Sequence, residues 1–316
     1  MSMASAPGSL QARPKDRRTG SQRRSSTGSY MKRSARITAS QQHPTSEGQA
    51  VHHRTVQLWR AFRLGMVGLT LLALPVRAAE LRILAAGAVR EVVQEQAALH
   101  EQATGIKLDI VFAAIGPLKA KILAGEKPDL VIMTPAVFKE LTEGGTLYLT
   151  AQAPLGRVGV GVAIKQGGTR PDLSSVATFK NALLATTALA YGDPKGTSSG
   201  AYFAQVLDRL GIAEQVQGKT QTFPDGHATM VYLATADSQA LGVTQISEII
   251  ANMQVGIEFV GPLPSDLQTF TTYVAGLPAH ASSATEARAF YDRLRGPAAQ
   301  KRFAEAGFEA VQSPGE

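Results

Sequence analysis

Three short turns of small residues carry the clearest chemical signal in this chain, because each leads from an expected strand towards an expected helix. The turns are Ala86-Gly87-Ala88, Ala114-Ile115-Gly116 and the segment from Gly196 to Gly200. A turn of this kind exposes the free amides and the positive dipole end of the helix, which bind an anion without any charged side chain. Several such turns around one cleft would hold a single small anion.

The third turn also contains the pattern of a serine hydrolase nucleophile. Residues 196–200 read G-T-S-S-G, a G-x-S-x-G sequence, and Asp266 and His280 follow in the chain order of α/β-hydrolases. A nucleophile elbow needs a tight turn directly after the strand, yet Gly192 to Lys195 intervene, and no Gly-rich oxyanion loop precedes the motif. A Ser/Thr cap before a helix has the same composition. A serine hydrolase with Ser198 as nucleophile is therefore the alternative function.

The sequence shows no other catalytic, metal or cofactor pattern. It contains no cysteine, so disulfides and thiolate metal sites do not arise. His100, His227 and His280 are far apart without metal-ligand spacing, and there is no Walker or dinucleotide fingerprint. We therefore expect no cofactor, no metal and no catalysis.

Residues 1–79 have the composition of an export leader. Residues 1–60 are rich in Ser, Gln, Arg and Thr with few large apolar residues, so we expect them to be disordered. An apolar run from Gly65 follows two arginines and ends in V-R-A-A at 76–79, the layout of a signal peptide. A retained membrane anchor is the alternative, although the run is shorter than the roughly 20 residues that span a bilayer. The prediction is an exported, periplasmic protein, either free or tethered.

The net charge changes sign once this leader is set aside. The whole chain carries +7, but residues 1–79 hold 13 Lys and Arg against Asp16 and Glu47, which is +11 and leaves −4 for residues 80–316. The remaining part has no basic run with interleaved aromatic residues, so nucleic acid is not expected as a partner. Its length suits one large or two medium domains.

The region after the leader alternates short apolar strands with helical patterns, which predicts an α/β fold with mainly parallel sheets. The expected strands cover 81–86, 107–112, 129–132, 157–164, 187–191, 240–245, 256–260 and 271–275. The expected helices cover 89–102, 117–124, 135–143, 175–184, 199–210, 227–236, 284–295 and 298–306. Each of the three turns lies after one of these strands and before the next helix.

Several segments, in this order, resemble the periplasmic molybdate-binding proteins of ABC importers. They are LRILAAGAVREVV at 81–93, VFAAIGPLKAKILAGEKPDLVIM at 111–133, YGDPKGTSSGAYFAQVLDRLG at 191–211, LGVTQISEI at 241–249 and FYDRLRGPAAQKRFAEAGFE at 290–309. The resemblance covers residues 80 to about 311 and implies a type II periplasmic binding protein fold, with two α/β lobes joined by a hinge of crossing strands. Lobe 1 would comprise residues 80–156 and 252–316, and lobe 2 residues 157–251.

The resemblance also implies a ligand site at the turns, from which most side-chain donors are missing. The family holds its oxyanion with two hydroxyls, two backbone amides and a tyrosine hydroxyl. In chain order these contacts fall here at Ala88, at Ile115 or Gly116, at Ser199, near Gly226 and at Gln245. Each lost hydroxyl removes a hydrogen bond to a charged group, worth roughly 1.5–3 kcal/mol, so we expect the ligand preference to differ.

Neighbouring residues offer replacement contacts. Gly87 belongs to the first turn, and Thr197 and Ser198 add hydroxyls to the third. Arg157 would either clamp a carboxylate with two hydrogen bonds or form a surface or interlobe ion pair. His227 would either contact the ligand or be an ordinary polar residue at the start of a helix. The expected ligand is a molybdate-like oxyanion or a small organic carboxylate.

The sequence as a whole predicts a monomeric solute-binding protein that closes two lobes over one small anion. The crossing strands near Arg157 and in the later 250s would form the hinge. The resemblance implies that the partners are the membrane permease and the cytoplasmic ATPase of an ABC importer.

Overall fold

The computed structural model describes residues 80–311, so the expected leader and signal peptide at 1–79 lie outside the described residues. The described chain alternates strands and helices, and the α/β class predicted from the sequence is confirmed. Between residues 80 and 311, no helix is both long enough and apolar enough to cross a membrane.

The strands form one hydrogen-bonded path in the order β2-β1-β3-β9-β4-β7-β5-β6, with β10 and β8 also paired to β4. Their bounds are β1 (Glu80–Ala86), β2 (Lys107–Ala113), β3 (Leu130–Met133), β4 (Leu149–Lys165), β5 (Leu189–Gly192), β6 (Thr220–Phe223), β7 (Leu241–Gln245), β8 (Ile257–Pro262), β9 (Phe270–Pro278) and β10 (Phe308–Glu309).

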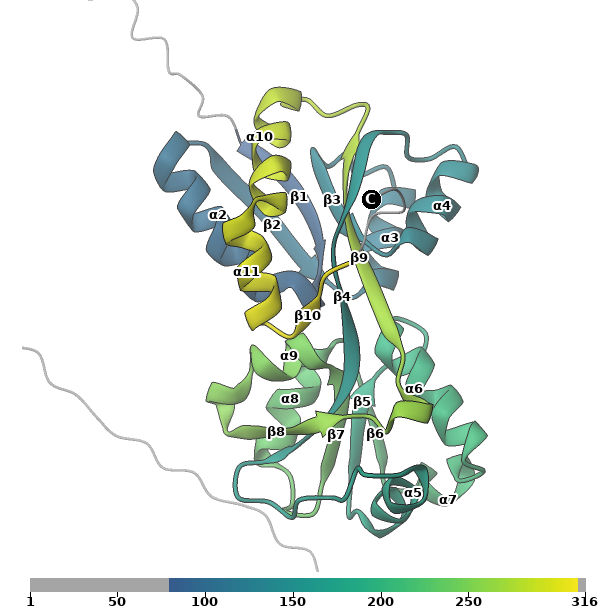
Figure 1. The fold of residues 1–316 in the computed structure, drawn as a ribbon. Helices are drawn as coiled ribbons and strands as arrows, with labels where there is room; N and C mark the ends of the chain where they lie inside the picture. The colour runs from purple at the N-terminus through teal and green to yellow at the C-terminus, as the bar shows by residue number, and fades with distance from the viewer. Residues whose placement is uncertain (1–79, 312–316) are drawn as a thin grey trace, which may run out of the picture. The chain divides into compact units, whose positions relative to one another are not determined.

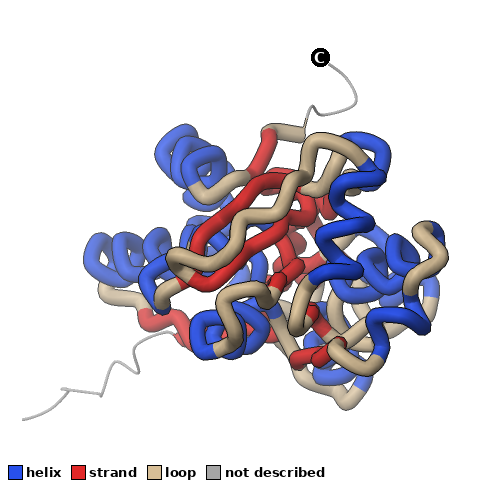
Figure 2. The backbone as a smooth tube through the Cα atoms, turned by 90° about the horizontal axis from the view of Figure 1, so that it is seen from below, coloured by secondary structure: helices blue, strands red, loops and turns tan. Residues whose placement is uncertain are grey.

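The helices cover both faces of the strands, as Figure 2 shows in a view along them. Their bounds are η1 (Gly87–Val89), α2 (Arg90–Thr104), α3 (Ile115–Leu123), α4 (Pro135–Glu143), α5 (Val176–Ala185), α6 (Ser198–Arg209), α7 (Ala213–Gln217), α8 (Gly226–Thr235), α9 (Ile246–Ile250), η2 (Met253–Val255), η3 (Ser265–Leu267), α10 (Ala284–Arg295) and α11 (Pro297–Glu305).

One group of elements is built around β1, which pairs in parallel with β2 and β3 (Figure 1). Apolar residues of α2, α10 and α11 pack on one face of these strands, where Val93, Phe290 and Phe303 are buried. Residues of α3 and α4 pack on the other face, where Leu118 and Phe138 are buried. Burial of large apolar side chains on both faces stabilises this group, which we call the first lobe.

A second group, the second lobe, contains β5 paired in parallel with β6 and β7. Its main core buries Phe179 of α5 and Phe203 of α6 against strand residues such as Val243. A smaller core lies under α8 and α9 and includes Met230 and Ile249. The two lobes therefore have separate apolar cores.

Strand β4 runs through both lobes. Its residues 149–159 pair with β9, whereas residues 160–165 pair with β7 and β8. The sequence predicted only 157–164 as strand, so β4 begins earlier than expected. Because β8 pairs with the end of β4 in the second lobe, the second crossing is made by β9 and not in the later 250s.

The lobe boundaries remain a proposal. The predicted division assigns residues 252–316 to lobe 1, yet β8 within that range pairs with 161–165 of β4, on the edge opposite β7. We therefore propose that the return to lobe 1 lies near the start of β9, while the first crossing stays near residue 157.

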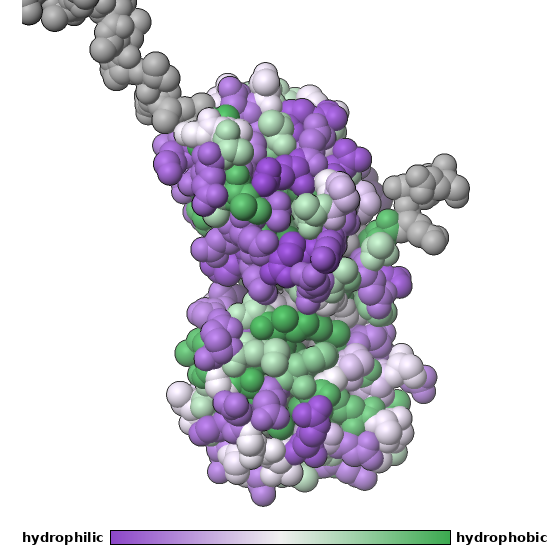
Figure 3. Space-filling view, turned by 60° about the vertical axis from the view of Figure 1, so that its left-hand side comes forward, coloured by the Kyte–Doolittle hydropathy of each residue, from purple (hydrophilic) through white to green (hydrophobic). Residues whose placement is uncertain are grey.

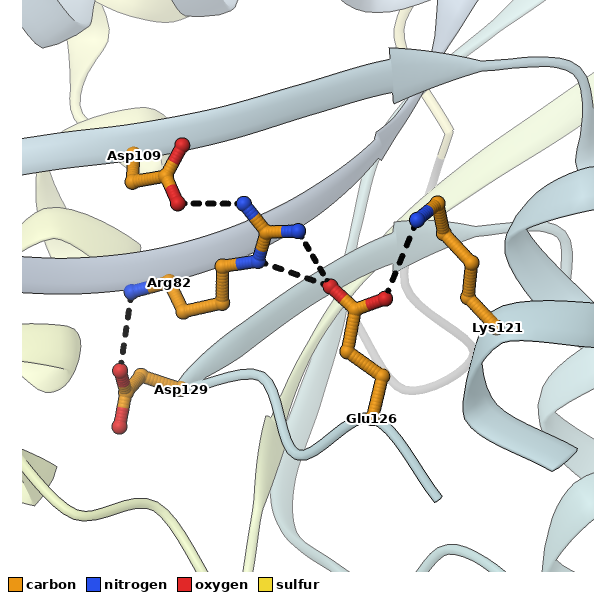
Figure 4. Close-up of polar contacts among 5 residues, drawn as sticks. All are labelled: Arg82, Asp109, Lys121, Glu126 and Asp129. Atoms are coloured by element: carbon orange, nitrogen blue, oxygen red, sulfur yellow. Dashed lines mark hydrogen bonds and ion pairs between the residues drawn. The ribbon is translucent and has the colours of Figure 1, made fainter. Parts of the chain in front are cut away.

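An ion-pair network fixes the amino-terminal end of β1 (Figure 4). Arg82 pairs with Asp109 and Glu126, and its backbone amide donates to Asp129 Oδ2 at 2.9 Å. Lys121 Nζ also lies 3.3 Å from Glu126 Oε2. Burial acts to raise the pKa of Glu126, but Arg82 and Lys121 outweigh it and hold that pKa below its ordinary value. The network ties the loop before β3 to the amino-terminal end of β1. The candidate site lies at the opposite, carboxyl end of this strand.

Apolar surface residues gather on one face of the second lobe, while the corresponding face of the first lobe is mostly hydrophilic (Figure 3). The exposed large apolar residues of the second lobe lie on different elements, with Leu184 on α5, Val231 on α8 and Met253 in η2. Scattered exposed apolar residues are normal, but a gathered group is a candidate contact surface for another protein.

Candidate ligand site

A small cavity of about 20 Å³ lies where the two lobes meet, at the carboxyl ends of β1, β2 and β5. Such a position, outside the carboxyl ends of parallel strands, is where open α/β folds bind ligands. The lining residues are Ala86, Gly87, Ala88, Ala114, Ile115, Thr197, Ser198, Ser199, Asp225, Gly226, Gln245, Glu248 and Tyr273. None of these described lining residues is Lys, Arg or His.

Three helices of nine residues or more begin at this cavity, namely α3, α6 and α8. Each contributes its first residue and the residue before it to the lining, so the positive dipole ends of all three converge there. Some of their first amides already have partners within the chain, such as Gly200 with Thr197 and Ala228 with Asp225. The convergence of the three turns on one cavity agrees with the sequence, and helix N-termini favour negative charge; binding of an anion here stays a prediction.

The first two turns line the cavity with apolar groups. Ala88 is 7% exposed and belongs to η1, directly after β1. Ile115 is the first residue of α3, and its N-cap Ala114 has no side-chain cap hydrogen bond. A methyl group and a branched aliphatic chain thus stand where the resemblance places hydroxyls, so the walls on this side can donate only through the backbone.

The third turn holds three hydroxyls, but two of them are already engaged. Thr197 caps α6, because its Oγ1 accepts from the Gly200 amide at 3.1 Å and donates to the Asp193 carbonyl at 3.0 Å. Ser199 is 4% exposed and its Oγ lies 3.4 Å from Thr244 Oγ1. Ser198 has no side-chain hydrogen bond within residues 80–311, which leaves its hydroxyl available to a ligand.

Gln245, at the end of β7, and Tyr273, on the crossing strand β9, also line the cavity. Gln245 is 2% exposed, and its Nε2 donates to Thr271 Oγ1 at 2.9 Å. Its Oε1 is buried and has no hydrogen-bond partner in the described part of the chain. Burial raises the pKa of Tyr273 and the charge of Glu248 adds to the rise, whereas a hydrogen bond with the Gln245 side chain offsets part of it, so the phenol stays neutral.

The most informative group in the cavity is Glu248, which the sequence analysis did not identify. Its Oε2 accepts a 2.5 Å hydrogen bond from Thr244 Oγ1. Burial raises the pKa of Glu248 and the charge of Asp225 adds to the rise, whereas hydrogen bonds from Thr244 and from the backbone of Gln245 and Gly226 offset part of it. A carboxyl with a raised pKa therefore lies in the cavity where three helix N-termini converge.

Asp225, also missed, has a structural role beside the cavity. It is the N-cap of α8, and its Oδ1 accepts from the Ala228 amide at 2.8 Å. An Asp before a helix is a recognisable capping signal in the sequence. No comparable signal marks Glu248, which lies on the five-residue helix α9, or Tyr273, which arrives on β9.

Eight of the eleven residues predicted for the site line the cavity, and three do not. Gly116 lies next to it, with its amide donating to the Gly196 carbonyl at 3.1 Å, a hydrogen bond between the lobes. Arg157 points elsewhere, because it pairs with Glu309 at 2.7 Å and lies 4.5 Å over the ring of Phe270. His227 Nδ1 is 2.6 Å from Asn252 Oδ1, which fits the ordinary polar role. Whether the eight bind a ligand stays a prediction.

The structure gives the serine hydrolase no support. Ser198 lies in the first turn of α6, Asp266 is in η3, and His280 is in an exposed turn after β9. Neither Asp266 nor His280 lines the cavity with Ser198, and no hydrogen bond joins these side chains anywhere between residues 80 and 311. The G-x-S-x-G pattern is a helix cap, with Thr197 as the capping residue. Residues 80–311 also contain no cluster of acidic or His side chains that could hold a metal ion.

Two lobes that share β4 and enclose a pocket of helix N-termini define a type II periplasmic binding protein. The family described as bacterial extracellular solute-binding protein matches residues 81–309, and the chain belongs to it. It is an extracytoplasmic solute-binding protein, with the expected fold confirmed.

The individual relatives of this chain are described as different kinds of protein, one as an enzyme and others as binding proteins. An aconitate isomerase from Pseudomonas sp. is 28% identical over 258 residues, covering 78% of this chain and 96% of the relative. The molybdate-binding protein of Escherichia coli (strain K12) is 27% identical over 235 residues, covering 72% and 88%. The structure of the periplasmic molybdate-binding protein of Azotobacter vinelandii matches with a TM-score of 0.60 at 17% identity, covering 74% of this chain and 100% of that one. At 17% identity, the similarity to the Azotobacter vinelandii structure supports the fold and nothing more specific.

Proposed function

We propose that this protein captures a small organic carboxylate in the periplasm and delivers it to the permease and ATPase of an ABC importer, without chemical change. The convergence of α3, α6 and α8 on a cavity without basic side chains carries the proposal. The apolar walls at Ala88 and Ile115 favour a ligand with carbon atoms over a compact oxyanion such as molybdate. The exposed apolar residues of the second lobe are a candidate contact for the permease.

The size of the cavity supports a hinged mode of capture. About 20 Å³ is room for roughly one water molecule. A carboxylate enters only if the lobes part, and β4 and β9 are the strands about which they would move. The protein would act as a monomer that closes on one ligand, free in the periplasm or tethered to the membrane, and nucleic acid would play no part.

A thermal-shift screen of the purified protein tests this function. The panel contains molybdate, tungstate, sulfate and phosphate beside succinate, malate, citrate and cis- and trans-aconitate, and calorimetry follows for each anion that shifts the melting temperature. A ligand at 100 times its Kd adds about 2.7 kcal/mol of stability. Stabilisation by carboxylates supports the proposal. Stabilisation by molybdate alone contradicts the carboxylate assignment, and no stabilisation by any anion contradicts the function.

A second candidate function is the isomerisation of an unsaturated carboxylate. It is favoured by the relative named aconitate isomerase and by a carboxyl of raised pKa in the pocket. The Glu248 carboxylate would remove a proton from the carbon next to the double bond. As the double bond shifts, Glu248 would return a proton to its far end, so that no other reactant is needed.

Proton exchange distinguishes the two functions. Incubation of the protein with cis-aconitate in D₂O, followed by proton NMR, shows deuterium incorporation and the trans isomer if Glu248 transfers protons. Glu248→Gln abolishes both signals in that case, while Glu214→Gln, an exposed change of equal charge in the same lobe, leaves them intact. Binding of aconitate without exchange or isomerisation leaves transport as the function.

A further inference from the structure

The cavity contains more hydrogen-bond acceptors than a site for a fully ionised anion needs. Two side-chain acceptors line it, the half-buried Glu248 carboxyl and the buried Gln245 Oε1. The hydroxyls of Thr197 and Ser199 are already engaged, which leaves Ser198 and the neutral Tyr273 phenol as the side-chain donors of the lining. An anion that brings only acceptor oxygens would therefore find the helix amides favourable and the two acceptor side chains, Glu248 and Gln245, unfavourable.

The Glu248 carboxyl reaches across the site from one lobe to the other. A Cβ added to Gly226, at the start of α8 in the second lobe, would lie 2.1 Å from its Oε2. A Cβ added to Gly87, in the first turn of the first lobe, would lie 3.2 Å from its Oε1. Any ligand held between these two glycines is therefore in contact with Glu248.

Gln245 provides an independent sign of what the site lacks. Its amide nitrogen is occupied by Thr271 Oγ1 at 2.9 Å, and the residue is 2% exposed. The remaining Oε1 has no partner among the described residues. A buried acceptor without a partner is costly, so a ligand that donates a hydrogen bond to it removes that cost.

We propose that Glu248, assisted by Gln245, makes the pocket selective for small anions that carry a hydrogen-bond donor beside their negative charge, such as hydroxycarboxylates and hydrogen phosphate. A donor hydroxyl satisfies the carboxylate directly. A donor-free anion, such as succinate, sulfate or molybdate, places two acceptors against each other and binds only when a proton is taken up between them. The inference rests on the proposed anion-binding function and specifies its ligand class.

The proton requirement gives a pH dependence of known sign. Glu248 faces Asp225 of α8 and Tyr273 of β9, whereas the lining residues of the first two turns carry no titratable side chain. Burial and the Asp225 charge favour the protonated form of Glu248. A donor-free anion binds this protonated form, so its affinity falls about tenfold per pH unit above the pKa of the ligand-free protein. A donor-bearing anion also binds the ionised form and loses less affinity.

Pairs of ligands that differ in one hydrogen-bond donor test the effect of that donor on affinity. Malate differs from succinate by one hydroxyl, and hydrogen phosphate differs from sulfate by an ionisable hydrogen on the same tetrahedral shape. Calorimetry on the full protein at about pH 5.5 and about pH 8.5 measures each affinity ratio in the wild type, Glu248→Gln and the exposed control Glu214→Gln. The malate pair reports an organic ligand, and the phosphate pair an inorganic one.

In the wild type, the ratio of donor-bearing to donor-free affinity is expected to be about tenfold or more at the higher pH, and the malate–succinate ratio is expected to shrink at the lower pH. Phosphate itself gains a proton between the two pH values, so the phosphate–sulfate ratio is compared at the higher pH only. Glu248→Gln removes most of the pH dependence of the malate–succinate ratio, since an amide both donates and accepts, and Glu214→Gln behaves as the wild type. A second test needs no variant: calorimetric titration of the wild type in two buffers of different ionisation enthalpy measures the number of protons taken up on binding. At the higher pH, binding of a donor-free anion should be accompanied by uptake of close to one proton.

Three results would overturn the inference while leaving anion binding intact. They are equal affinities within both pairs at the higher pH, a ratio unchanged in Glu248→Gln, and binding of succinate, sulfate or molybdate without proton uptake at the higher pH. If no anion binds the wild type at either pH, the proposed function fails first, and the inference fails with it.

Discussion

Gly116→Ala tests whether the contact between the lobes controls ligand affinity. The Gly116 amide donates to the Gly196 carbonyl at 3.1 Å across the lobes. A Cβ at residue 116 would lie 3.2 Å from Gly196 Cα and 3.3 Å from its carbonyl oxygen, so the lobes would have to separate by a few tenths of an ångström. Loss of this hydrogen bond costs the closed form about 0.5–1.5 kcal/mol, which corresponds to an affinity about two- to tenfold weaker.

The open, ligand-free form should not be destabilised by the same change. Gly116 is in the first turn of α3, directly before Pro117. The preference for Ala over Gly in a helix interior, about 0.5–1 kcal/mol, is therefore offset by the restriction that proline places on a preceding residue with a Cβ. We expect calorimetry to show weaker binding while the melting temperature of the ligand-free protein is unchanged. Gly218→Ala is the control, because a Cβ there meets nothing within 4 Å. Unchanged affinity, or a ligand-free melting temperature that falls with it, would refute the reasoning.

Three further changes probe the site, its surroundings and the fold. Gly226→Ala places a Cβ 2.1 Å from Glu248 Oε2. We expect calorimetry to show ligand affinity weakened at least about a hundredfold, and thermal unfolding to show stability reduced by about 1–3 kcal/mol. The control Gly218→Ala should show neither effect. Arg157→Ala should leave the ligand affinity unchanged. It should reduce the free energy of unfolding, measured with denaturant, by less than about 1 kcal/mol, because its ion pair with Glu309 is exposed. A large loss of affinity would instead place Arg157 in the site. Because the pKa of Glu126 is lowered in the folded state, its contribution to stability is present above the unfolded pKa of about 4.3 and is lost as pH falls through the lower folded pKa. The melting temperature should therefore fall less in acid for Glu126→Gln than for the wild type, and equal slopes would contradict this.

Elements with strong local signals were predicted closely from the sequence. The helix expected at 135–143 occupies those residues, because Pro135 opens it and Phe138 and Leu141 share its buried face. The strand at 81–86 lies in β1, where most side chains are buried. Such patterns depend on neighbours in the chain, and the sequence contains them fully.

Elements that depend on distant partners were missed. The first half of β4 includes Pro154 and irregular pairing with β9, so its apolar pattern is broken. β6 has four residues, half-buried or exposed, and pairs only with β5 among the described strands. α9 is five residues long. Each becomes regular through contacts made elsewhere in the fold, which single-sequence periodicity does not report.

The same distinction applies to the candidate site: features set by neighbouring residues in the chain were predicted, and features set by distant contacts were not. The three turns were predicted because a strand, tiny residues and a helix follow one another locally, and they do meet at one cavity. Arg157 was considered because an arginine suits a carboxylate, but the sequence does not indicate that Glu309 lies opposite it on β10. Glu248 was missed for the converse reason, since only the packing of α9 against η1 and α8 brings its carboxyl between Gly87 and Gly226.

Affinity and selectivity therefore have different origins in this pocket. Helix amides attract any small anion and depend little on side-chain identity, so the shared fold of relatives with different names does not determine a common ligand. Selectivity depends on the side chains between the helix ends, and here these are a methyl group at Ala88, an aliphatic chain at Ile115 and acceptors at Gln245 and Glu248. With the half-buried Glu248 carboxyl in the site, we expect fully ionised oxyanions to be excluded or bound together with a proton. The protonation state of the ligand, more than its shape, then decides which anions the protein retains.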